Sequence, residues 1–103
     1  MKDDLKKAII DKQGDMLYIT LSEECAEVIQ ACTKIQRAKY HGKDFSDRVD
    51  NLLEEINDVL INIELIKCQL LNEESLNLTE EELNKRLEEW KQKKTEKCIK
   101  IFL

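Results

Sequence analysis

The sequence predicts an all-α protein. It has no proline and only two glycines in 103 residues, and 5% of its residues are aromatic. Proline and glycine interrupt helices and aromatic residues favour strands, so this composition is typical of long helices. A chain of this length forms one domain, 1–103, that buries only about two-thirds of its unfolded surface. We therefore expect an antiparallel bundle of three to four helices, completed by oligomerisation as a dimer or tetramer.

Two helices are predicted before residue 43. The first is short, carries Leu5, Ala8 and Ile9 on one face and stops at Gly14. The second begins after Asp15, which can act as its N-cap, and ends at His41–Gly42, where glycine can adopt the left-handed C-cap conformation. Its apolar residues recur at helical spacing within a narrow arc: Leu17, Leu21, Val28, Ala31, Ile35 and Ala38.

Two more helices follow the short loop "KDFS". The third helix has one apolar face, made of Leu52, Ile56, Val59, Ile63, Ile66 and Leu70, before the polar stretch "NEESLNL" interrupts the pattern. Thr79 and Glu82 then form a capping-box signature for a last helix from about Glu80 to about Cys98. Its stripe is Leu83, Leu87, Trp90, Lys94 and Cys98, with Trp90 expected in the core. Short connections predict antiparallel neighbours.

Charge and hydropathy exclude several classes of protein. The net charge of −5 argues against partners such as polymeric nucleic acid or a membrane surface, although residues 91–100 are locally basic. No apolar run approaches the roughly 18 residues of a membrane span, and no signal-peptide pattern is present, so we expect a cytoplasmic protein of a bacterial cell or a phage-infected host. The cysteines have no C-x-x-C spacing and are interpreted as small core residues: Cys25, Cys32, Cys68 and Cys98.

One acidic residue of the second helix lies inside its apolar stripe. At about 100° per residue, Glu24 falls about 20° from Leu17, and Glu27 lies near the edge of the stripe. A buried carboxylate needs a partner, because leaving water unpaired costs several kcal/mol. On the third helix, Glu55 lies at the edge of the apolar face and Asp58 lies a little beyond it.

The two pairs, Glu24-x-x-Glu27 and Glu55-x-x-Asp58, could place four carboxylates at one site between adjacent helices. Four such groups repel unless they are protonated or neutralised, and a hard divalent cation such as magnesium takes oxygen ligands. The alternative is a solvated acidic face, which charged helices commonly have. Di-iron sites generally need Glu-x-x-His pairs, and the only histidine, His41, lies at a helix end.

The motifs "EECAE" and "EEIND", with Glu55 28 positions after Glu27, resemble the all-α nucleoside triphosphate pyrophosphohydrolases of the MazG type. The similarity is closest to the short, single-domain versions of phages and bacteria. The wider strings "LSEECAEVIQACTKIQR" and "NLLEEINDVLINIELIK" extend it over residues 15–72, whereas "LEEWKQKKTEK" in the last helix fits more loosely.

This resemblance implies magnesium-dependent hydrolysis of a nucleoside triphosphate to the monophosphate and pyrophosphate, with manganese as an alternative metal. The metal ligands would be Glu24, Glu27, Glu55 and Asp58. Either Glu27 or Glu23 would accept the proton of the attacking water. Cationic and polar residues expected to bind the nucleotide are Lys34, Arg37, Asn62, Lys94 and Lys97.

A second interpretation of the same residues is non-catalytic. The bundle would then bind a nucleotide, a metal or a partner helix without turnover. A short coiled-coil adaptor is disfavoured, because loops break the apolar stripes before three heptads are complete.

Overall fold

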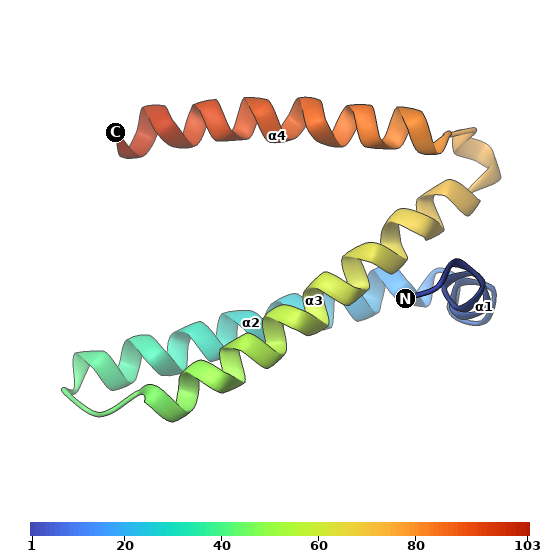
Figure 1. The fold of residues 1–103 in the computed structure, drawn as a ribbon. Coiled ribbons are helices and arrows are strands. Elements are labelled where there is room, and N and C mark those ends of the chain that lie inside the picture. The colour runs from blue at the N-terminus through green and yellow to red at the C-terminus, as the bar shows by residue number, and fades with distance from the viewer. The chain divides into compact units, whose positions relative to one another are not determined.

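Every regular element is helical in the computed structural model, which describes residues 1–103. The elements are α1 (Asp3–Gln13), α2 (Met16–Tyr40), α3 (Ser46–Asn72), the short 3-10 helix η1 (Glu74–Leu76) and α4 (Glu80–Phe102) (Figure 1). The all-α prediction is thereby confirmed. No helix combines the length and the hydropathy that a membrane crossing requires.

The chain divides into two compact units, Met1–Gln69 and Leu70–Leu103. The first contains α1, α2 and most of α3. The second contains the last residues of α3, η1 and α4. Each unit is described separately, and the single domain 1–103 stays a prediction.

The first unit has a small core where α1, α2 and α3 meet. Ile10, Leu17 and Leu65 are its buried members. Gly14, with φ of +52°, separates α1 from α2, and its N–H donates to the Ile10 carbonyl at 2.8 Å. Leu5, which the sequence placed on the apolar face of this helix, is exposed. The packed residue is Ile10, because the end of α1 beside the Gly14 turn is the part that reaches Leu17 and Leu65.

Helices α2 and α3 run antiparallel, side by side, and are joined by residues 41–45 (Figure 1). Gly42 has φ of +65°, the left-handed conformation expected at this helix end. Leu17, Ala31 and Ala38 of the predicted α2 stripe are buried. Asp15 is at the N-cap position of α2 as predicted, but it has helical backbone angles and its side chain makes no capping bond.

Helix α3 packs on the apolar face that the sequence predicted and also on its acidic edge. Five members of the predicted face are half-buried: Leu52, Val59, Ile63, Ile66 and Leu70. Its buried residues are Leu65 and Gln69, and half-buried positions include Glu55, Asp58 and Asn62. The acidic edge is therefore half-buried beside the predicted apolar face, and Ile56 is the one member of that face left exposed.

In the second unit, α4 begins where the sequence predicted. The Thr79 hydroxyl oxygen accepts a hydrogen bond from the Glu82 backbone N–H at 3.2 Å, and the helix continues to Phe102, one turn beyond Cys98. Leu83 is the buried residue of α4. Trp90 is exposed, so its expected place in a core was wrong for this structure.

The cysteine prediction was also largely wrong. All four thiols are free, and Cys25, Cys32 and Cys98 are exposed. Only Cys68 packs against the core cluster. Cys25 and Cys32 lie on the part of α2 that neither α1 nor α3 covers, so their small size is not used to fill a core.

Candidate metal centre

Three carboxylate groups meet between α2 and α3. One oxygen from each of Glu24, Glu55 and Asp58 lies within 4.8 Å of the other two. Glu24 comes from the packed face of α2, while Glu55 and Asp58 are three residues apart on α3 and so project from adjacent turns. All three are half-buried. The predicted convergence of acids from two antiparallel helices is present in the structure.

Glu27 adds a fourth carboxyl group to this cluster. The largest cause that raises the pKa of Glu55, to about 7, is a side-chain hydrogen bond with Glu27. Removal from solvent and the negative charges of Glu27, Asp58 and Glu54 act in the same direction. Because two carboxylates cannot hydrogen-bond without a proton, this hydrogen bond favours the protonated form of Glu55.

Removal from solvent is the main cause that raises the pKa of Glu24, followed by the charges of Asp58, Glu27 and Glu23. Oε2 of Glu24 and Oε2 of Glu55 are shielded from solvent and have no hydrogen-bond partner. The lysines of α1 and α3 that form ion pairs, Lys6 and Lys67, do so with Glu64. The cluster therefore has buried acceptor oxygens without a positive charge beside them.

These residues fit a hard divalent cation. Every donor is a carboxylate oxygen, which is the ligand type that magnesium and calcium prefer. Two of the oxygens are buried and unpartnered, a condition that costs free energy unless a cation or a proton neutralises it. Carboxylates without histidine or cysteine do not suit zinc or a di-iron centre.

Two further predicted residues lie beside the cluster. Glu23 is exposed on α2 and acts on the cluster through its charge, which helps to raise the pKa of Glu24. Asn62 is one turn after Asp58, and its amide nitrogen Nδ2 donates to the Asp58 backbone carbonyl at 2.8 Å. That bond fixes the Asn62 side chain against α3 next to the acidic residues.

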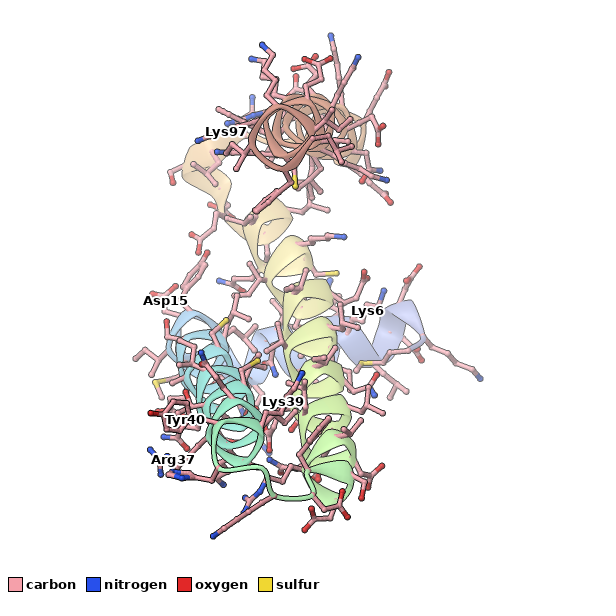
Figure 2. The ribbon with its side chains drawn as sticks, turned by 90° about the vertical axis from the view of Figure 1, so that its left-hand side faces the viewer. Lys6, Asp15, Arg37, Lys39, Tyr40 and Lys97 are labelled. Atoms are coloured by element: carbon pink, nitrogen blue, oxygen red, sulfur yellow. The ribbon has the colours of Figure 1, made fainter.

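The predicted cations are not gathered at the carboxylates. Lys34 and Arg37 are exposed on α2. Arg37 lines a shallow surface hollow with Thr33, Gln36 and Tyr40, and Figure 2 shows Arg37 and Tyr40 on the side of α2 that faces away from α3.

Lys94 and Lys97 belong to α4, in the second unit. The ammonium groups of Lys93 and Lys94 lie 5.1 and 5.9 Å from the centre of the Trp90 ring, within the range of cation–π attraction. Sequence reasoning expected Lys94 at a stripe position but did not foresee this contact.

Comparison with known proteins finds no matching family model, no matching curated protein and no matching solved structure. Interpretation of the site therefore depends on the motif residues and on their geometry. The hydrogen bond between Glu27 and Glu55 is a feature that the sequence did not indicate, because side-chain spacing along one helix says nothing about contacts with the next.

Proposed function

We propose that this protein is a magnesium-dependent nucleoside triphosphate pyrophosphohydrolase of the MazG type, which releases a nucleoside monophosphate and pyrophosphate. The observation that carries the proposal is the meeting of Glu24, Glu55 and Asp58 from two helices within one small volume. The finer description of the fold belongs to the same proposal: a MazG-like antiparallel bundle completed by another copy of the chain. The expected location is the cytoplasm, where nucleoside triphosphates are abundant.

In this proposal Glu24, Glu27, Glu55 and Asp58 hold the metal. When bound, magnesium neutralises charge on the phosphates and lowers the pKa of a coordinated water; manganese is the alternative ion. Either Glu27 or Glu23 accepts the proton of the water that attacks phosphorus. Because the pKa of Glu55 is raised to about 7, its carboxyl group must lose its proton before it can serve as a metal ligand.

The nucleotide needs positive and polar groups in addition to the carboxylates. We assign this role to the residues suggested by the sequence: Lys34, Arg37, Asn62, Lys94 and Lys97. Lys34 is seven residues after Glu27, almost two helical turns, and so lies on the same side of α2. Asn62 is already fixed one turn from Asp58 by its bond to the helix backbone.

The test is to incubate the purified protein with a panel of nucleoside triphosphates and magnesium and to separate the products. We expect monophosphate and pyrophosphate in equal amounts, dependent on the metal. Glu55→Gln should reduce turnover at least 100-fold, because a removed metal ligand costs more than the 10- to 100-fold loss typical of its supporting residues.

Glu54→Gln is the matched control, since Glu54 is the exposed neighbour of Glu55 on α3 and should leave turnover nearly unchanged. Release of inorganic phosphate in place of pyrophosphate would contradict the reaction assigned here. Nucleotide or metal binding without any turnover would favour the non-catalytic alternative, a helical module that binds a nucleotide, a metal or a partner protein.

A further inference from the structure

Helix α4 has an apolar stripe that is covered only at its beginning. Leu83, near the start of the helix, is buried, whereas Leu87, Trp90 and Ile101 expose 42%, 56% and 61% of their surface. At about 100° per residue, these four residues lie within about 60° of one another around the helix axis. The stripe therefore continues along the helix beyond the point at which the chain covers it.

The charges of α4 are separated around the helix. Five cations lie within about 80° of Leu83, on the side of the stripe: Arg86, Lys91, Lys93, Lys94 and Lys97. The glutamates that follow Glu80 all lie about 100° or more from Leu83: Glu81, Glu82, Glu88, Glu89 and Glu96. We call the side of α4 that carries Leu87, Trp90, Ile101 and the five cations the basic face.

The cations of the basic face are not neutralised by carboxylates of the chain. The ion pairs of the structure join Lys6 and Lys67 to Glu64, and none involves a residue of α4. Two of the cations instead lie beside the aromatic ring of the stripe, Lys93 at 5.1 Å and Lys94 at 5.9 Å from its centre. The basic face therefore combines exposed apolar side chains with positive charges that are available to an anionic partner.

We propose that the basic face of α4 binds the surface of a membrane that contains anionic lipids. An amphipathic helix of this kind lies in the plane of the membrane surface, with its apolar side chains at the boundary of headgroups and acyl chains. Lysine and arginine beside the stripe are attracted to the anionic headgroups, and their methylene stems can stay on apolar surface. Trp90 suits this boundary, because its ring is apolar and its N–H can still donate to a polar group.

The composition of the basic face favours lipid over nucleic acid. Surfaces that bind single-stranded nucleic acid place aromatic rings among their cations, and successive bases stack on those rings. The basic face has one such ring, Trp90, and its other exposed apolar members, Leu87 and Ile101, are aliphatic. Aliphatic side chains cannot stack with bases, but they gain free energy when acyl chains remove them from water.

The net charge of the whole chain does not oppose this contact. Charges act at a membrane surface over about 8 Å at physiological ionic strength, and a helix with its side chains is about 10 Å across. The glutamates on the opposite side of α4 are therefore largely screened. Residues 91–103 contain five lysines and one glutamate, so the local charge is positive. For α4, the proposal revises the expectation, drawn from the net charge, that no membrane surface is bound.

The experiment uses the fluorescence of Trp90, which is the only tryptophan of the chain. The full chain is mixed with vesicles of phosphatidylcholine, prepared with and without phosphatidylglycerol, and the vesicles are then sedimented. With the anionic vesicles we expect the emission to move to shorter wavelength and the protein to sediment. Neutral vesicles should cause neither change, and sodium chloride should reverse the binding, because salt screens the attraction.

Two matched pairs of variants locate the contact. Ile101→Asp and Ile99→Asp make the same change at exposed positions, but Ile99 lies about 160° from Leu83 and so outside the basic face. Ile101→Asp should weaken vesicle binding at least about tenfold and Ile99→Asp by much less. Lys91→Gln should weaken it about fivefold, whereas Lys85→Gln, about 160° from Leu83, should have little effect.

These changes avoid the residues assigned to the nucleotide, Lys94 and Lys97, so the test does not depend on the proposed function. Far-UV circular dichroism verifies that each variant keeps its helices. Equal binding to neutral and anionic vesicles, or no binding to either, would overturn the proposal. Equal losses in Ile101→Asp and Ile99→Asp would also overturn it, because the contact would then lie elsewhere. A change of Trp90 emission with a single-stranded oligonucleotide, but not with anionic vesicles, would assign the basic face to nucleic acid instead.

Discussion

Glu55 is the residue at which protonation and metal binding in the acidic cluster compete. Its carboxyl group is held between the other acids of α2 and α3, and a hydrogen bond with Glu27 keeps it protonated up to a pKa of about 7. A proton and a divalent cation are alternative ways to neutralise the same oxygens. The state of Glu55 therefore links the pH dependence of the metal-free protein to its ability to bind a metal.

The raised pKa of Glu55 predicts the pH dependence of stability in the absence of metal. An unfolded chain releases this proton near the ordinary value of 4.5, whereas the folded chain keeps it up to about 7. The folded state therefore binds more protons between these values, and the free energy of unfolding falls as the pH rises through that window. Glu55→Gln, which cannot ionise, should have a flatter profile and exceed the wild type in stability above pH 7.

Urea denaturation in the presence of EDTA, at steps from pH 4.5 to 8, measures this difference. Glu54→Gln is the control and should keep the wild-type slope, since Glu54 is only the smallest of the causes acting on Glu55. Parallel profiles for wild type and Glu55→Gln would show that the pair of Glu27 and Glu55 does not hold the proton.

A divalent cation should stabilise the folded chain through the same oxygens. Magnesium that binds only the folded state raises the free energy of unfolding by about 2.7 kcal/mol at 100 times its dissociation constant. Glu24→Gln and Asp58→Asn should lose this response, and without metal they should be as stable as the wild type or more stable, because repulsion among the acids is relieved.

Thermal unfolding with and without magnesium at pH 8 measures this response. Asp50→Asn, an exposed change on α3, should respond as the wild type does. Equal melting shifts in all variants would place the bound ion at a different site.

The acidic residues could be predicted from the sequence because their positions on each helix follow from the helical period alone. Glu24 lies inside an apolar stripe, and Glu55 and Asp58 share one edge of the next helix. The cations could not be predicted in the same way. Arg37 extends from the outer side of α2, since a long flexible side chain on an exposed face has no neighbour to direct it toward the site.

At the scale of the helices, the sequence indicated each element but not the full width of the packed surface of α3. Apolar spacing and the turn at Gly42 were sufficient to predict α2 and α3. The pattern also predicted that the apolar face of α3 would pack within the chain; five of its six residues are half-buried, and the edge with Glu55 and Asp58 is half-buried beside them. Spacing shows which residues share a face; it does not show how far the packed surface extends beyond that face.

The start of α4 is an element whose stability depends on one side chain. Thr79 accepts the Glu82 N–H bond, and Thr79→Ala should cost about 1 kcal/mol of local stability, because the amide is left without a partner. Hydrogen exchange of the first-turn amides of α4 should become about fivefold faster. Thr95→Ala, within the same helix, is the control and should leave those amides unchanged. Unaltered exchange in Thr79→Ala would show that the cap does not stabilise this helix end.

At the scale of the whole molecule, the small core is the feature that needs an explanation. The buried cluster of the first unit consists of Ile10, Leu17 and Leu65. Three buried side chains are a small core for three helices. Many large apolar side chains are left in contact with water instead. Chains of this size commonly complete their core through association, and the proposed function includes such an assembly with another copy of the chain.

A chain that completes its core in this way should be more stable at higher concentration. Association stabilises the folded state by mass action, so raising the wild-type concentration 100-fold above its dissociation constant should add on the order of a few kcal/mol and raise the melting temperature by several degrees. Calorimetry or circular dichroism at 1 to 100 μM gives the comparison. A wild-type melting temperature independent of concentration would mean that α1, α2 and α3 reach their full stability within one chain, and that their exposed apolar side chains serve no association between copies.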